Sequence, residues 1–155
     1  MGGKHVSSMK IKVLQVVAIC LAAFGVAGEA APSKYSEGQV WEYNNRPQDA
    51  GSLLKIQRVS MVANRMIYHV SIIGVHFARP GIAGMLSHAP VSEETLDASV
   101  TRLSSRSVVF PLLSTVDEGI VEWERAKGGV FTIPVSQIVE IADEQISQAE
   151  LDNHN

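Results

Sequence analysis

Two histidines in one apolar run are the first residues of this 155-residue chain whose spacing suggests chemistry. A metal ion or an acid–base pair would need His69 and His76 on the same side of their segment, residues 65–77. Residues of opposite parity on a β-strand point to opposite faces of the sheet. No H-E-x-x-H motif is present, and the single cysteine, Cys20, excludes a Cys-based zinc site. We therefore expect no metal and no cofactor, with His69 hydrogen-bonded within the sheet and His76 on the surface at the end of the strand.

Serine is abundant, but no serine lies in the G-x-S-x-G elbow of a hydrolase nucleophile. Ser87 and His88 are adjacent in sequence, whereas a catalytic serine and its base are recognised by their geometry in space. The sequence therefore predicts no catalytic residues. The alternative is a small hydrolase that uses His69 or His88 with a serine or a carboxylate.

Three carboxylates crowd together near the C-terminus, at Glu140, Asp143 and Glu144. Carboxylates three or four positions apart share a face of a helix, where they can bind a cation or act as an acid–base pair. We place this face opposite the apolar stripe of the same helix, which predicts a solvated acidic surface.

The most suggestive constellation for binding is an aromatic pair, and two arginines supply a weaker signal. Trp41 and Tyr43 are two positions apart, so they share one face of a strand that we expect at the edge of the sheet. Large aromatic residues at such a place belong either to the core or to a contact surface. Arg46 and Arg79, each beside a proline, are candidate donors for an anion at the rim of the sheet.

The connection formed by residues 80–90 is a further candidate for a contact surface. Loops of this length in a compact domain are usually functional or disordered, and methionine adapts well to varied partners. We expect this loop, with the neighbouring strand end, to contact a protein partner. The alternative is that its apolar residues fold back as a lid over the sheet. The candidate binding residues are therefore His76, Arg79, Met85, Leu86, Trp41 and Tyr43.

The elements that position these residues follow from hydrophobic periodicity. Residues 38–43, 52–62 and 65–77 are β-rich runs separated by short polar connections, which predicts an antiparallel meander with a turn at Asn64. Both faces of the third run are largely apolar, so we expect a central strand covered on both sides.

The second half of the chain changes to helical spacing. Leu96, Val100 and Leu103 form one apolar stripe after an N-cap at Ser92. A capping box at Thr115 predicts a second helix, residues 130–133 a fourth strand, and residues from 134 onward a last helix. The predicted order βββ-αα-β-α describes an α+β fold, a small antiparallel sheet with helices packed on it.

The first thirty residues have the feature order of a secretory signal peptide. Three lysines precede the apolar run 13–26, and small residues follow it. We expect cleavage between Gly28 and Pro32, whether translation starts at Met1 or at Met9, with a retained anchor as the alternative. Residues 1–30 are thus a predicted signal peptide, and residues 31–155 a single domain with no cysteine and no stable membrane anchor after cleavage.

Charge and motifs narrow the function further. The formal charge of −3 and the sequence pI of about 5.9 give no general attraction to nucleic acid. Nucleotide-binding and calcium-loop motifs are missing as well. We expect a small periplasmic or secreted binding protein of the inhibitor or immunity type, with a protein as its partner.

Overall fold

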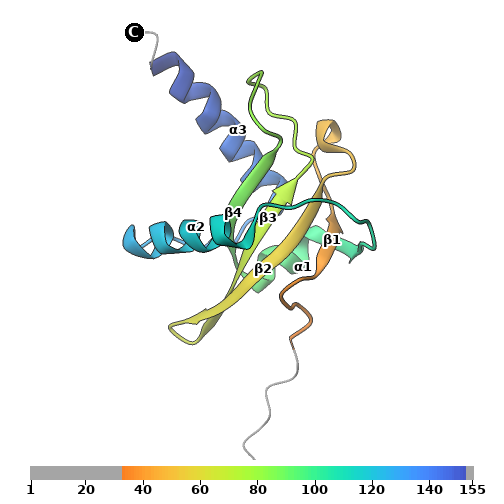
Figure 1. Ribbon diagram of the computed structural model, residues 1–155, viewed down its shortest axis with the longest axis vertical. Coiled ribbons are helices and arrows are strands. Elements are labelled where there is room, and N and C mark those ends of the chain that lie inside the picture. The colour runs from red at the N-terminus through yellow and green to blue at the C-terminus, as the bar shows by residue number, and fades with distance from the viewer. Residues whose placement is uncertain (1–32, 153–155) are drawn as a thin grey trace, which may run out of the picture. The chain divides into compact units, whose positions relative to one another are not determined.

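The computed structural model describes residues 33–152, so the expected signal peptide and both candidate start codons lie outside the described residues. Within this range the chain forms a five-stranded antiparallel sheet and three α-helices (Figure 1). The α+β class and the small antiparallel sheet predicted from the sequence are confirmed. None of the three α-helices combines the length and the apolarity needed to cross a bilayer.

The strands lie side by side in the order β4-β3-β2-β1-β5. Their bounds are β1 Val40–Tyr43, β2 Leu53–Val62, β3 Arg65–Ile73, β4 Met85–Val91 and β5 Val100–Leu103. A short 3-10 helix, η1 (Pro47–Asp49), lies between β1 and β2, and the α-helices are α1 Glu93–Ser99, α2 Leu113–Arg125 and α3 Val135–Asp152.

The predicted turn at Asn64 is confirmed. Ala63 and Asn64 have φ of 48° and 63°, and the flanking Val62 and Arg65 pair across the hairpin. Positive φ at both central residues is the geometry of a two-residue turn that matches the twist of the adjoining strands. The hairpin therefore fixes the register between β2 and β3.

Part of the predicted loop 80–90 is instead an edge strand, β4, and β3 ends at Ile73 rather than at residue 77. Gly74 ends β3 because its φ of 75° is incompatible with a strand. Pairing of β4 with β3 satisfies backbone groups that an irregular loop would leave exposed. Pro90 is tolerated because a proline can occupy an edge strand, where its missing N–H need not face a neighbour.

The first predicted helix is also shorter than expected. Val100 and Leu103 belong to β5, which pairs with β1, so β1 is an inner strand and not the edge strand. Val100 and Thr101 are β-branched and therefore favour an extended chain. Strand β1 supplies the backbone hydrogen-bond partners that a continued helix would have supplied from within itself. The predicted fourth strand at 130–133 is reduced to one bridge, between Val91 and Phe131. No side chain caps α2, so Thr115 does not form the expected capping box.

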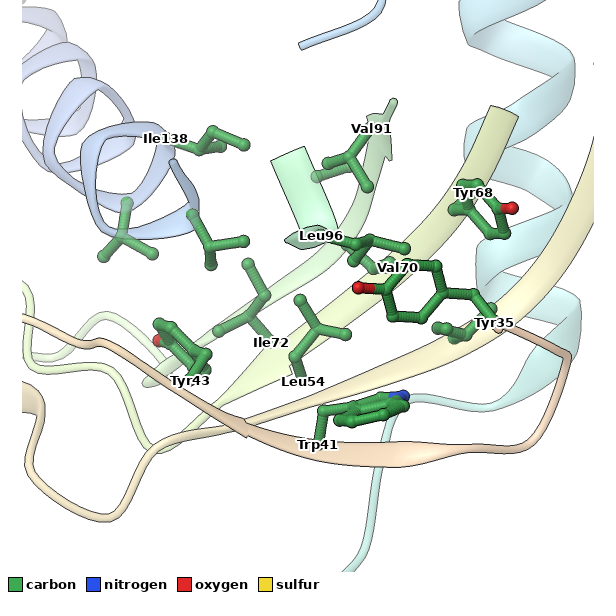
Figure 2. Close-up of a cluster of buried hydrophobic side chains, with 14 of the residues drawn as sticks. Tyr35, Trp41, Tyr43, Leu54, Tyr68, Val70, Ile72, Val91, Leu96 and Ile138 are labelled. Carbon is green, nitrogen blue, oxygen red and sulfur yellow. The ribbon is translucent and has the colours of Figure 1, made fainter. Parts of the chain in front are cut away.

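The sheet is covered on both faces, as the apolar third run predicted. Tyr68, Val70 and Ile72 of β3 are fully buried on one face, beneath α1 and the first half of α3 (Figure 2). His69 and Ser71 are fully buried on the other face, beneath α2. The first face is an apolar core, whereas the face beneath α2 combines the polar His69 and Ser71 with the buried apolar Ile67 and Val116, so the two faces differ in chemistry.

Candidate functional site

A cluster of buried charges joins three distant parts of the chain. This buried ion cluster consists of Arg46 before η1, Asp49 in η1, and Glu140 and Asp143 in α3. Arg46 Nε donates to Asp49 Oδ2 at 2.6 Å, and Arg46 Nη1 donates to Glu140 Oε2 and Asp143 Oδ2 at 2.9 Å each. Arg46 is 7% exposed, and Asp49 is completely buried. One guanidinium thus hydrogen-bonds three carboxylates, and two of these, Asp49 and Asp143, have little access to water.

Neighbouring groups stabilise the ionised forms of Arg46 and Asp143 in this cluster. Burial by itself would lower the pKa of Arg46, but hydrogen bonds to the three carboxylates outweigh burial and raise it above its ordinary value. Burial would likewise raise the pKa of Asp143, but the Ala78 amide and the Arg46 guanidinium outweigh burial and lower it. Arg46 and Asp143 therefore stay ionised at neutral pH, each beside a group of opposite charge.

The remaining oxygens of the cluster hold the start of the connection between β3 and β4, which we call the 74–84 loop. The His76 amide donates to Asp49 Oδ1 at 2.6 Å, and the Ala78 amide donates to Asp143 Oδ1 at 2.8 Å. Arg46 Nη2 donates to the His76 carbonyl at 3.1 Å. These backbone bonds fix the first half of the loop against η1 and α3.

Beyond its fixed base, the loop and the first residue of β4 expose apolar side chains. Ile82 is 38% and Met85 40% exposed, and the side chain of His76 is 70% exposed. Arg79 is half-buried, and Leu86 packs against the core. The expected surface position of His76 is confirmed. The contact-surface interpretation thus applies to Ile82 and Met85, which face solvent. The lid interpretation applies to Leu86, which folds back onto the core.

Trp41 and Tyr43 are both buried in the core. Trp41 Nε1 donates to Gln39 Oε1, and the Tyr43 hydroxyl bonds the Ser52 hydroxyl at 2.7 Å. Burial raises the pKa of Tyr43 to about 12. Because a partner cannot reach these side chains without unpacking the core, they are not part of the surface proposed below.

A second polar arrangement lies beneath α2, where Ser60, His69 and His88 form a hydrogen-bonded chain. Ser60 Oγ and His69 Nε2 are 2.8 Å apart, and His69 Nδ1 and His88 Nε2 are 2.9 Å apart. Trp123 of α2 meets the His69 ring edge to face at a centroid distance of 5.4 Å. Gly119 permits this close approach of the helix, since a Cβ there would lie 3.0 Å from His88. The expected hydrogen bonding of His69 within the sheet is confirmed.

Burial keeps this histidine chain neutral. It lowers the pKa of His69 to about 4, with His88 adding to the effect, and it also lowers the pKa of His88. The chain has room for one added proton, because Ser60 can change from donor to acceptor when His69 carries both N–H groups. A second proton would set two N–H groups facing each other between the rings.

The arrangement resembles the nucleophile, base and orienting group of a hydrolase in its connectivity alone. A general base works best with a pKa near the operating pH, whereas burial disfavours the protonated state of His69 that catalysis would form. The nearby groove of about 400 Å³ is lined by other residues: Val62, Ile67, Trp123, Glu124, Lys127, Gly128 and Val130. These observations weigh against the hydrolase alternative and favour a structural role for the chain.

Ser52 and Lys55 show a Ser-x-x-Lys spacing, so the expectation that no serine of the chain has this spacing is wrong. Ser52 is buried and donates to the Ile73 carbonyl at 2.6 Å. The Lys55 ammonium lies 5.7 Å from the centre of the Phe110 ring. The two residues have opposite parity on one strand, so their side chains leave opposite faces of the sheet. This spacing therefore creates no nucleophile.

The neutral histidine chain predicts a loss of stability in mild acid. The folded-state pKa of His69 lies below its ordinary value of 6.5, so the unfolded chain binds more protons between pH 6.5 and about 4. Stability should be fully present above pH 6.5 and should fall by about 2–3 kcal/mol as the pH approaches 4, since each pKa unit is worth about 1.4 kcal/mol. Urea unfolding across this range measures the slope.

His69→Gln should flatten this acid slope, because glutamine takes up no proton in this pH range. An equal slope in the wild type and in His69→Gln would contradict the assignment to His69.

Two predictions about charged residues are wrong. Arg46 is not available to an external anion, because the chain's own carboxylates occupy its donors. Asp143 is buried and not solvated. The sequence does indicate this burial, because position 143 follows the buried Val139 by four residues and so shares its face of the helix. Arg79 is half-buried and stays an untested candidate. Within residues 33–152 no three His, Cys, Asp or Glu side chains converge as a metal site would require.

The geometry thus brings together the exposed loop residues and separates them from the buried aromatic pair. The most elaborate arrangement of charged and hydrogen-bonded groups is the buried ion cluster at the base of the 74–84 loop. No sequence motif indicates it. Comparisons of the chain with protein-family models, with curated proteins and with solved structures found no match.

Proposed function

We propose that this chain is an exported, periplasmic or secreted binding protein that contacts a protein partner through the 74–84 loop, in the manner of an inhibitor or immunity protein. The observation that carries this proposal is the buried ion cluster, whose free oxygens bond the backbone of His76 and Ala78. Burying charges is costly unless they are paired and hydrogen-bonded, and here the bonds go to a loop that ends in solvent.

A loop fixed in advance binds more tightly than a mobile one, because less conformational entropy is lost on association. Exposed apolar side chains on such a loop and directly after it provide the contact itself, and Ile82 of the loop and Met85 at the start of β4 supply them here. Export is proposed from the order of charge, apolar run and small residues at the N-terminus. Together these features support a recognition role in preference to catalysis.

Replacing Ile82 and Met85 together by serine should abolish partner capture while leaving the melting temperature nearly unchanged. The full chain is expressed with its N-terminal segment, immobilised, and exposed to extract from cells that produce it naturally. Both side chains are exposed, so their loss should cost at most about 0.5–1 kcal/mol of folding stability. Leu86 is left intact because it packs against the core.

The matched control is Met61→Ser with Val62→Ser, at the far hairpin, where the two side chains are 64% and 45% exposed. A partner retained by the wild type and by this control but lost by the loop variant supports the proposal. Equal retention by all three proteins, or no retained protein at all, contradicts it.

A further inference from the structure

The net charge of the described chain resides in one helix. Ten of its acidic residues and all ten of its basic residues lie outside α3, so the remainder is formally neutral. Helix α3 has no lysine or arginine, and its acidic residues are Glu140, Asp143, Glu144, Glu150 and Asp152. Negative charge near a helix C-terminus opposes the helix dipole. Glu140 and Asp143 bond Arg46, whereas the acidic residues nearer the C-terminus gain nothing from the helix dipole.

The second half of α3 also has little cover from the rest of the chain. Burial in this helix ends at Asp143, after which Ile146 is half-buried and Glu144, Gln145 and Gln148 are exposed. Figure 1 shows α3 running away from the sheet beside the connection between β3 and β4. Short helical segments without tertiary packing are marginal in water, so this half of α3 offers a face for another molecule.

The projecting helix and the 74–84 loop border the same groove, of about 270 Å³. Its lining residues are Ala78 from the loop and Glu140, Asp143, Glu144, Ser147 and Gln148 from α3. The base of the 74–84 loop and the acidic face of α3 therefore meet at this groove, so the loop, with its exposed Ile82, and α3 border one surface.

We infer that this surface docks a protein whose contact face carries lysine or arginine side chains around an apolar site. Charge complementarity selects this occupant, because the acidic excess is confined to α3 while the rest of the chain is balanced. Opposite charges around an apolar contact speed association and exclude partners of the wrong sign. The inference rests on the proposed function and adds to it the chemistry of the partner and the participation of α3.

Site-specific photo-cross-linking in the full chain tests the inference. A benzoylphenylalanine probe replaces Ile82 at the loop tip, Gln148 on α3, or Thr101 on β5, and all three positions are exposed. Irradiation in cells that produce the protein naturally should attach the same basic protein at positions 82 and 148 but not at 101. Mass spectrometry identifies the attached protein, which is then purified for binding measurements.

Reversal of one charge on each of two helices gives a matched pair of variants. Glu144→Lys on α3 should weaken binding to the purified partner about five- to tenfold at low salt, and this loss should shrink as salt is added. Glu118→Lys on α2, which is also exposed, should leave binding within about twofold of the wild type.

The outcomes separate the two proposals. Attachment at position 82 alone, with equal affinities for the two charge variants, overturns the docking surface and leaves the proposed function standing. A second copy of this chain as the attached protein overturns the inferred partner. Attachment at neither position 82 nor position 148 overturns both proposals.

Discussion

Arg46→Met is expected to lower the free energy of unfolding by about 3–5 kcal/mol, the usual cost of removing one partner from a buried ion pair. The variant leaves the buried carboxylates of Asp49 and Asp143 without their counter-charge. It also removes the donor to the His76 carbonyl. Urea unfolding at neutral pH measures the loss, and hydrogen exchange at the Ala78 amide should show that the loop base opens more often.

Arg102→Met is the matched control, because Arg102 pairs with Glu42 on the surface and its side chain is 75% exposed. Exposed ion pairs contribute about 0–1 kcal/mol, so this variant should unfold almost as the wild type does. Equal losses from the two arginine variants would show that the buried ion cluster does not hold the loop.

Ile72→Ala is expected to destabilise the protein by about 2–5 kcal/mol, the range for truncating a buried aliphatic side chain. Ile72 lies near the end of β3 and is completely buried against the core. Its loss leaves a cavity that the surrounding strands and helices can close only in part. Chemical denaturation measures the change in the free energy of unfolding.

The same truncation at an exposed isoleucine, Ile82→Ala, should cost at most about 0.5–1 kcal/mol. A loss well below 1 kcal/mol for Ile72→Ala would contradict the central position of β3.

The central strand was predictable from the sequence because its two faces are buried for different reasons. Alternate residues of β3 meet an apolar core on one side and the helix α2 on the other, so the whole run reads as apolar with two polar interruptions. The hairpin at Asn64 was predictable because positive φ suits few residue types. Local chemistry decides both features.

The edge strands β4 and β5 were missed because pairing with a neighbour decides them. Leu96, Val100 and Leu103 satisfy helical spacing, yet the chain extends at Val100 because β1 offers hydrogen-bond partners there. Pro90 and the nearby glycines suggested a loop, yet β4 pairs along β3. Tertiary contacts override local pattern most readily in short segments such as these.

The candidate site was predictable only at its exposed residues. The sequence indicates His76 and Met85 as candidates because each lies close to residues that form turns. The ion cluster joins Arg46 to Asp143 across 97 positions, and no spacing rule relates residues so far apart. The partner of His69 was missed for a related reason, because a bulge in the pairing of β3 and β4 lies beside His88.

The hydrogen bond between the Ala78 amide and Asp143 links the folding of two distant segments, 65 positions apart in the chain. Opening of α3 near Asp143 removes an acceptor from the loop, and displacement of the loop removes a donor from the helix. Free-energy coupling between two segments is reciprocal. A molecule that holds the loop in place therefore also slows the fraying of the C-terminal helix, and shortening that helix weakens whatever the loop binds.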